Sequence, residues 1–223
     1  MKIVPSSARS VFTDLFRRYG PQFWWPANSA FEVMIGAVLT QNTAWRNVEK
    51  ALANLKAHKA LNLRALNALR DDTLASCLRP AGTYNVKLKR VRALCEWLVS
   101  QGGISRLHRR STSELRSELL NINGVGPETA DAILLYALQR PVFVIDAYTR
   151  RLAQRLGWAS GKEPYDHLRS EFEYALSPDP QIFNEYHALI VVHGKQHCRS
   201  SPLCVGCCLA QNCDHNSALG RSQ

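Results

Sequence analysis

Apolar residues recur at helical spacing along almost the whole chain. From Ser29 onward they occupy positions 31, 34, 35, 38 and 39, the spacing of a helix that buries one face. Ser29 and Glu32 have the spacing of a capping box at the start of this helix. The same periodicity predicts further helices over roughly residues 45–57, 62–69, 87–100, 112–120, 127–139, 147–156, 165–175 and 181–193.

No segment alternates between apolar and polar residues strongly enough to predict a sheet. The apolar run 142–145 has strand character, but it is short and isolated. The predicted helices are joined by short connections rich in Gly, Pro or Asn, such as Pro80-Ala81-Gly82. We therefore predict a compact all-α protein.

Composition and charge narrow the range of functions. Hydrophobic residues make up 46% of the 223 residues, which is typical of a globular protein and too many for a disordered one. The net charge of +10 favours a polyanionic partner such as nucleic acid, although many basic proteins bind none. No run approaches the roughly 18 apolar residues of a membrane span, and the N-terminus lacks a signal-peptide core. We expect a cytoplasmic protein, in which clustered cysteines indicate a metal or cofactor rather than disulfides.

The segment 119–130 predicts two helices joined by a glycine turn. Gly124 and Gly126 enclose Val125, and Pro127 suits the first position of the following helix. Glycines let the backbone approach another group closely and leave N–H donors at the helix start, which bind phosphate oxygens without reading sequence. Taken alone, the pattern also fits an ordinary helix–turn–helix connection with no ligand.

Asp146 follows the apolar run 142–145 and precedes a predicted helix. An N-cap is the simplest role for an aspartate there. An ionised carboxylate could also stabilise the cationic sugar that forms when a glycosidic bond breaks, and orient or deprotonate an attacking water. The two roles are compatible, because a cap fixes the direction of the carboxylate.

The hairpin followed by Asp146 resembles the endonuclease III (helix-hairpin-helix, Gly/Pro-Asp) superfamily of DNA glycosylases. The resemblance spans about residues 10 to 213. It implies two helical lobes flanking a DNA-binding cleft, one lobe formed by 30–138 and the other by 1–29 with 139–197. It also implies a monomer, associated with the nucleoid, that acts on double-stranded DNA containing a damaged base. Asp146 and Glu128 are then the catalytic residues, and the residues implied to contact DNA include Gly124, Val125, Gly126 and Arg151.

Glu128 stands where endonuclease III has the lysine that attacks the sugar. A carboxylate cannot form an imine, so the resemblance implies a monofunctional, hydrolytic glycosylase. Another lysine or the N-terminal amine could substitute, which leaves weak lyase activity open. Glu128 at the mouth of a pocket would favour a cationic base, but a solvated glutamate suited to the helix dipole explains the residue equally well.

Tryptophans are concentrated near the N-terminus, at Trp24, Trp25 and Trp45. We assign the preceding Phe23 to the core, whereas two adjacent tryptophans cannot easily face one core together. Tryptophan faces stack on nucleobases and attract cations. The segments 24–26, 31–43, 82–87 and 126–133 resemble 3-methyladenine DNA glycosylase III. This likeness implies a base pocket lined by Trp24, Trp25, Trp45, Glu128 and Asp146, with Gln41 filling the gap left by a flipped base and Lys87 contacting the DNA backbone.

Four cysteines near the C-terminus follow the pattern Cys198-x5-Cys204-x2-Cys207-x5-Cys213. Structural zinc usually takes two separated Cys-x2-Cys or Cys/His pairs, and only one such pair is present. The loop 198–213 and the residues before it resemble the iron–sulfur loop of endonuclease III, although the first gap is one residue shorter. This resemblance implies a structural [4Fe–4S] cluster that pins Lys195 near DNA phosphates. Cys208 is extra, and 3-methyladenine glycosylase III is not expected to carry a cluster.

Three functions follow from these patterns. The first is a monofunctional base-excision repair glycosylase that flips alkylated purines such as 3-methyladenine out of DNA. The second is an endonuclease III-like glycosylase and lyase acting on oxidised pyrimidines, against which Glu128 argues. The third is a non-catalytic helix-hairpin-helix DNA-binding protein, against which Asp146 and the tryptophans argue.

Overall fold

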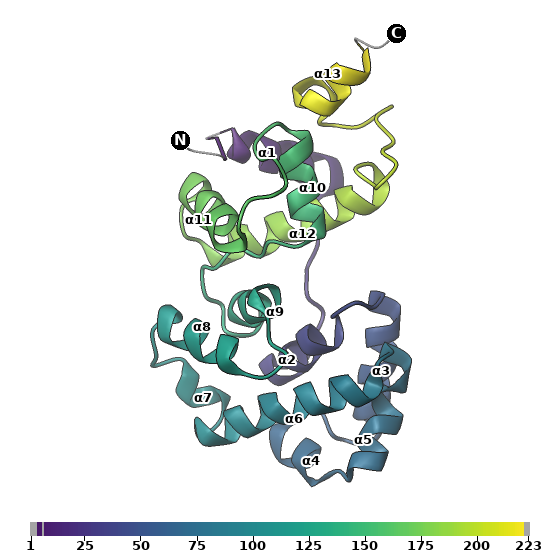
Figure 1. Cartoon of the computed structure of the whole chain (residues 1–223), viewed down its shortest axis with the longest axis vertical. Coiled ribbons are helices and arrows are strands. Elements are labelled where there is room, and N and C mark those ends of the chain that lie inside the picture. The colour runs from purple at the N-terminus through teal and green to yellow at the C-terminus, as the bar shows by residue number, and fades with distance from the viewer. Residues whose placement is uncertain (1–3, 6, 221–223) are drawn as a thin grey trace. The chain divides into compact units, whose positions relative to one another are not determined.

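The computed structural model describes residues 4–5 and 7–220, and every regular element among them is helical (Figure 1). The prediction of an all-α protein is therefore confirmed for this part of the chain. The run 142–145, which has strand character in the sequence, is an irregular segment whose four side chains are all buried. None of the described helices has the length and apolar character needed to cross a membrane.

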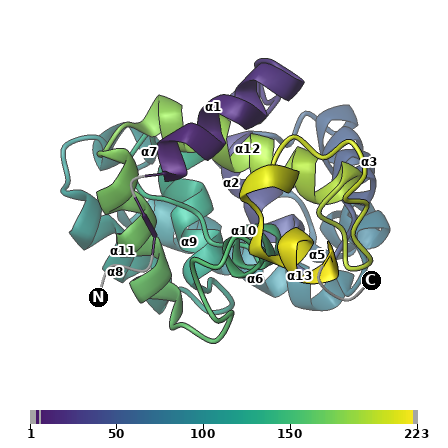
Figure 2. The same cartoon turned by 90° about the horizontal axis from the view of Figure 1, so that it is seen from above.

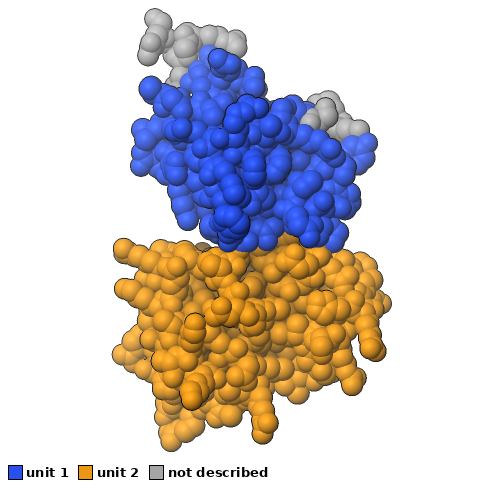
Figure 3. Space-filling view, turned by 180° about the vertical axis from the view of Figure 1, so that it is seen from behind, with its two compact units in different colours: residues 1–24, 141–223 blue, residues 25–140 orange. Residues whose placement is uncertain are grey.

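The chain divides into two compact units (Figure 3). Unit 1 contains residues 1–24 and 141–223, so it is built from both ends of the chain, and unit 2 contains residues 25–140. Each unit has its own hydrophobic core.

Unit 2 is built around a central helix, α2 (Ala30–Leu39), that is buried on nearly every side. All its residues except Ala30 and Glu32 are buried, so the helix has more than the single buried face that the sequence indicated. It packs against α3 (Trp45–Ala57), α6 (Tyr84–Ser100) and α9 (Pro127–Ala132). The other helices of the unit are α4 (Leu63–Ala68), α5 (Asp71–Leu78), α7 (Ile104–Leu107) and α8 (Thr112–Asn121), with a short 3-10 helix, η1 (Arg79–Ala81), after α5.

The start of α2 differs in one detail from the predicted capping box. The Ser29 hydroxyl accepts a hydrogen bond from the Glu32 N–H, as the box requires. The Glu32 carboxylate, however, accepts from the N–H of Asn28 rather than that of Ser29. The reciprocal half of the cap is thus displaced by one residue.

Helix α9 continues as a widened π-helical turn, η2 (Ile133–Ala137), rather than as the regular helix predicted to residue 139. The Leu138 N–H donates to the carbonyl of Ile133, five residues earlier. All five side chains of η2 are buried, and the turn packs against α2. The segment after the hairpin is therefore part of the core of unit 2.

Unit 1 joins the N-terminal helix α1 (Ala8–Tyr19) to α10 (Ala147–Arg155), α11 (Tyr165–Leu176) and α12 (Pro180–Gln196). Figures 1 and 2 show α1 beside α12, and the two helices are in contact. The core is rich in aromatic rings: Phe143 stacks on Phe172 at 4.7 Å and meets Phe183 edge-on at 5.4 Å. After the cysteine loop come η3 (Ala210–Asn212) and α13 (Asp214–Gly220).

A buried ion pair joins the two helices of the hairpin. Arg116 on α8 makes two contacts with Asp131 on α9, at 2.6 and 3.1 Å between nitrogen and oxygen. The Asp131 side chain is fully buried and that of Arg116 is 15% exposed. Two parallel bonds fix the relative orientation of α8 and α9, and so shape the turn between them.

We predict that Asp131→Asn lowers the free energy of unfolding by about 3 kcal/mol, because it removes the fully buried anion that the Arg116 guanidinium contacts twice. Urea denaturation followed by circular dichroism measures this change. Asp72→Asn is the matched control, because Asp72 pairs with Arg70 at an exposed site and should leave the stability nearly unchanged. Equal stability of the two variants would contradict the role given to the buried pair.

Candidate active site

Gly124 occupies the tightest point of the hairpin. Its φ of +81° lies in the left-handed region that favours glycine, and a Cβ there would lie 2.4 Å from Cγ of Arg90. Gly126 is different, since it is extended and a Cβ would meet nothing within 4 Å. Val125 is buried, and its N–H donates to the carbonyl of Ile122 at 3.0 Å. The open backbone of this turn is therefore at Gly126 and the exposed start of α9.

Gln41 is fastened to the hairpin. Its side-chain amide donates to the Gly124 carbonyl and to the Thr129 hydroxyl, both at 2.9 Å. Its carbonyl oxygen accepts from the Arg90 guanidinium. To fill the gap left by a flipped base, Gln41 would exchange these three hydrogen bonds for bonds to DNA.

Trp25, Trp45 and Tyr136 form an aromatic cluster within unit 2. The Trp25 ring meets Trp45 nearly perpendicularly at 5.0 Å and lies 5.2 Å from Tyr136. Gly36 makes room for this arrangement, because a Cβ there would lie 3.1 Å from Cζ2 of Trp25. The sequence pattern did not predict that Tyr136 belongs to this cluster, because there it is only one apolar position in a helical run. Only the folded structure brings it to the tryptophans.

Trp24 belongs to unit 1, so the three tryptophans expected in one pocket are divided between the two units. The Trp24 ring lies 5.8 Å from the Lys195 ammonium, within the range of a cation–π contact. Lys195 is exposed, as expected for a residue that contacts phosphates. The indole N–H groups of Trp24 and Trp25 are buried with no hydrogen-bond partner in the described part of the chain.

The assignment of Phe23 to the core is wrong. Its side chain is 83% exposed, and its φ of +50° is left-handed. The preceding residue is fixed, because the Gln22 N–H donates to the Glu185 carboxylate at 2.7 Å and the Gln22 amide donates to Tyr19 and Gly20 carbonyls. The chain turns sharply at Phe23, and this turn leaves the ring in solvent.

Asp146 caps α10, as the sequence predicted. One carboxylate oxygen, Oδ1, accepts from the Thr149 N–H at 2.7 Å. The other, Oδ2, lies 3.6 Å from Nε2 of His187 on α12. Both side chains are largely shielded, with exposed fractions of 14% for Asp146 and 7% for His187.

The carboxylate of Asp146 stays ionised at neutral pH despite its burial. Desolvation alone would raise its pKa, but the neighbouring His187 and the hydrogen bonds at Thr149 outweigh that effect, so the pKa is lowered. The structure therefore holds one shielded negative charge at the start of a helix. Such a group can stabilise a cation or accept a proton from water.

Glu128 is exposed in the first turn of α9. A negative side chain suits the positive end of a helix, as the sequence allowed. No lysine follows the hairpin at this position, so the amine that would form a covalent adduct with the sugar is absent from the start of α9.

The prediction that Lys87 contacts DNA is wrong. Lys87 is 1% exposed, and its ammonium donates to the carbonyls of Leu39 at 2.9 Å and Ala81 at 2.6 Å. These carbonyls end α2 and η1, where a helix leaves its last oxygens without partners inside the helix. The lysine is thus a buried cap for two helix ends, and burial lowers its pKa.

Arg151 is directed to the cysteine loop. Its guanidinium donates to the Cys198 carbonyl at 2.7 Å and approaches the Gly194 carbonyl at 3.4 Å. It also lies 5.0 Å from the Tyr148 ring. These contacts fix the end of α12 and the start of the loop, rather than leaving the guanidinium free for DNA.

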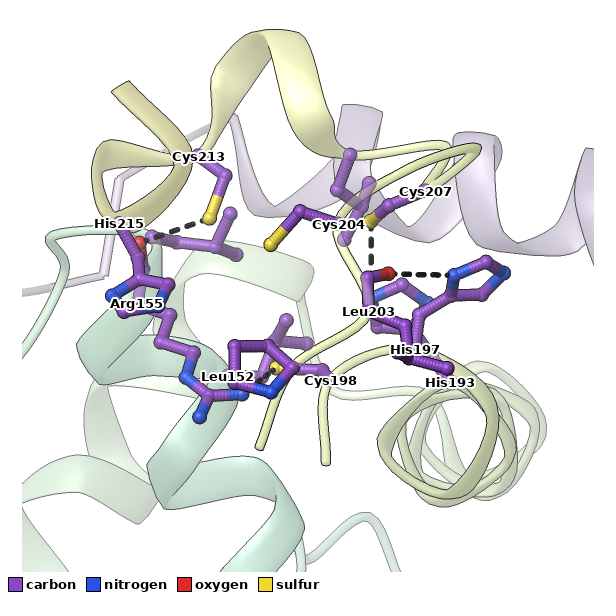
Figure 4. A pocket seen from close by; sticks show the side chains of 13 residues that line it. Leu152, Arg155, His193, His197, Cys198, Leu203, Cys204, Cys207, Cys213 and His215 are labelled. Carbon is purple, nitrogen blue, oxygen red and sulfur yellow. Dashed lines mark hydrogen bonds between the residues drawn. The ribbon is translucent and has the colours of Figure 1, made fainter. Parts of the chain in front are cut away.

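All four cysteines of the predicted cluster line one cavity (Figure 4). The Cys198 sulfur accepts from the Arg155 guanidinium at 3.2 Å, and the Cys213 thiol donates to the Arg155 carbonyl at 3.2 Å. Cys208 does not line the cavity. Within residues 4–5 and 7–220, no three His, Cys, Asp or Glu side chains converge closely enough to hold a single metal ion. Cysteine thiolates are soft ligands of the kind that bind zinc or iron–sulfur centres.

We predict that Lys87→Met acts on stability and not on DNA binding. Removing the ammonium leaves two buried carbonyls unsatisfied, which should lower the free energy of unfolding by about 2–4 kcal/mol. The salt dependence of DNA affinity, measured by fluorescence anisotropy, should keep its slope because no phosphate contact is lost. Lys89→Met is the control on the exposed side of α6 and should leave stability within about 0.5 kcal/mol. A reduced slope with intact stability in Lys87→Met would contradict this assignment.

Comparison with known proteins places these features in one family. The profile of the HhH-GPD superfamily of base excision DNA repair proteins matches residues 35–178. A protein of Methanocaldococcus jannaschii whose name places it among DNA repair glycosylases is 45% identical over 206 residues, which cover 91% of this chain and 94% of that protein.

Two solved structures are similar as well. The Helicobacter pylori 3-methyladenine DNA glycosylase bound to 1,N6-ethenoadenine is 31% identical, with a TM-score of 0.73 over 86% of this chain and 98% of that one. A non-covalent endonuclease III–DNA complex has a TM-score of 0.82 over 98% of this chain and 99% of that one, at 20% identity. The second likeness concerns the fold alone.

Proposed function

Since the chain belongs to the HhH-GPD superfamily and is a base excision repair DNA glycosylase, we propose that it hydrolyses the glycosidic bond of alkylated purines without cutting the strand. Two observations together carry the proposal: a shielded, ionised Asp146 caps α10, and Glu128 takes the place of a nucleophilic amine. We further expect the protein to act as a monomer on double-stranded DNA in the nucleoid.

The reaction would proceed by hydrolysis. The bond between the sugar C1′ and the base nitrogen breaks, and its electron pair leaves with the base, so positive charge develops on the sugar. Asp146 stabilises that charge and accepts a proton from the water that attacks C1′. The product is a free base and an abasic site in an intact strand.

Alkylated purines suit the aromatic residues of this chain. A base such as 3-methyladenine is cationic, so its glycosidic bond is already weakened and its departure needs no strong general acid. Indole rings attract cations and stack on flat bases, and Trp25 and Trp45 offer two rings at right angles. The 31% identical Helicobacter pylori structure, which holds 1,N6-ethenoadenine, supports a modified purine as the substrate.

The two rival functions make different demands on the site. An endonuclease III-like lyase needs an amine to form an imine with the sugar, and Glu128 is a carboxylate. A binding module without catalysis needs no shielded carboxylate at a helix start. Neither rival accounts for Asp146, Glu128 and the aromatic cluster together.

The substrate class can be tested with duplexes that carry 3-methyladenine, thymine glycol or uracil, analysed for strand breaks before and after alkali. We expect breaks only at the alkylated base and only after alkali. Breaks at thymine glycol without alkali would favour the lyase, and binding without base release would favour the non-catalytic module.

We predict that Asp146→Asn lowers the rate of base release by about 10²–10⁴-fold, because an amide carries no negative charge and takes no proton from water. Single-turnover kinetics with excess enzyme measure this rate. Asp179→Asn is the matched control, since Asp179 caps α12 in the same unit through Gln181 and Ile182. Because asparagine also caps helices well, this control should keep the rate of the parent protein. Equal losses in both variants would assign Asp146 to capping alone.

We also propose that Cys198, Cys204, Cys207 and Cys213 hold a [4Fe–4S] cluster, in line with the resemblance of their spacing to the loop of endonuclease III. A bound cluster would cross-link the loop 198–213 and so fix its shape. This chain's own residues already orient the site: Arg155 donates to the Cys198 sulfur, and Arg151 holds the Cys198 carbonyl. Hydrogen bonds to such sulfurs stabilise their thiolate form.

We predict that Cys207→Ser removes iron and the absorbance near about 400 nm that thiolate-bound iron–sulfur clusters show. Cys208→Ser, one residue away and outside the cavity, should keep both. Iron analysis of protein purified without oxygen checks the result. Zinc in place of iron, or an equal effect of the two substitutions, would contradict the assignment.

A further inference from the structure

His187 is a polar residue in the core of unit 1 next to Asp146. It lies in the middle of α12, and its side chain is 7% exposed. The ring meets Phe143 edge-on at 6.5 Å, and the preceding Tyr186 is fully buried. An apolar residue would suit these surroundings better, because burying an imidazole has a desolvation cost. The polar ring therefore calls for an explanation.

The explanation lies in how the Asp146 carboxylate is held. The Thr149 N–H donates to Oδ1 at 2.7 Å, and the Thr149 side chain also interacts with the carboxylate, but both contacts come from one residue of the same helix. Nε2 of His187 lies 3.6 Å from Oδ2, on the other oxygen. A second contact at this oxygen defines the plane of the group.

We propose that His187 is a positioning residue for Asp146, whose Nε2–H holds Oδ2 while Thr149 holds Oδ1. The proposal rests on the catalytic role of Asp146 proposed above. A carboxylate has about four acceptor positions, so Thr149 and His187 leave room for a hydrogen bond from the attacking water. The separation of 3.6 Å shortens to a hydrogen bond in the reacting complex, as catalytic contacts commonly do.

The fold supports this role because α10 and α12 pack against each other. Asp146 begins α10, and His187 projects from α12 toward its carboxylate. The distance between the two groups is thus set by the packing of two helices rather than by a loop. Such a support can keep a carboxylate in place while a base enters and leaves.

Two substitutions separate positioning from packing. Gln can place an N–H donor near the position of Nε2, whereas Leu fills the space without a donor. We expect His187→Leu to lower the single-turnover rate of base release by about 10- to 100-fold, as loss of an orienting partner does. The affinity for the duplex should stay within about twofold, and His187→Gln should restore most of the rate.

His167→Leu is the matched control, because His167 is exposed on α11 of the same unit. It should change neither the rate nor the affinity. Circular dichroism and melting curves verify that each variant is folded. A normal rate in His187→Leu, or equal losses with Leu and Gln, would overturn the proposal.

A second measurement does not depend on any substrate. The ¹³C signal of the Asp146 carboxyl, identified with Asp146→Asn, reports its titration by NMR. The groups that lower the pKa of Asp146 are the titratable His187 on α12 and the uncharged Thr149 on α10. His187→Leu should raise that pKa, because desolvation would then be opposed by Thr149 alone.

The two measurements distinguish failure of the proposed function from failure of the role given to His187. If the parent protein releases no alkylated base, the proposed function fails, and the NMR titration still decides whether His187 acts on Asp146. If the parent protein is active and His187→Leu changes neither the rate nor the titration, only the role of His187 is overturned.

Discussion

A single shielded negative charge, the carboxylate of Asp146, is the constraint on which the site depends. Burial disfavours a charge, so the surroundings must offset the lost hydration. The Thr149 N–H and the start of α10 do so on one side, and His187 lies on the other. The same helix ends at Arg155, which donates to the sulfur of Cys198. One short helix thus connects the carboxylate to the cysteine loop.

Unit 2 holds a tight backbone turn, the hairpin turn at Gly124, against its buried core. The left-handed Gly124 lies beside Arg90, and Gln41 fastens the turn through Gly124 and Thr129. The Arg116–Asp131 pair fixes the two helices on either side of it. Because α2 and η2 are buried almost completely, this turn is supported by the buried core of the unit.

Features with a local signal could be predicted from the sequence. The helices follow from apolar periodicity, the Asp146 cap from its place before a helix, and the turn at Gly124 from its glycines. The cysteine spacing indicated a shared site, and the four side chains do line one cavity. Each of these signals lies within a few residues of the feature that it predicts.

Features that depend on distant contacts could not be predicted. The sequence pattern predicts that Lys87 is a surface lysine. In the structure, the last carbonyls of two helices lie beside its ammonium and accept hydrogen bonds from it. The sequence pattern predicts that Phe23 is buried. In the structure, the hydrogen bonds of Gln22 come just before a sharp turn at Phe23, and the Phe23 ring is exposed. Tyr136 and His187 sit in apolar helical runs, and only packing brings them to Trp25 and Asp146. Apolar periodicity predicts which face of a helix a residue lies on. It does not predict which residues of other helices pack against that face.

In the proposed mechanism a carboxylate, and no amine, breaks the glycosidic bond. The most direct measurement is a single turnover of a duplex carrying 3-methyladenine in the presence of sodium borohydride, which reduces an imine to a permanent cross-link. This mechanism predicts free 3-methyladenine by chromatography and no protein–DNA adduct by denaturing electrophoresis. A stoichiometric adduct that forms as the base is released would contradict it.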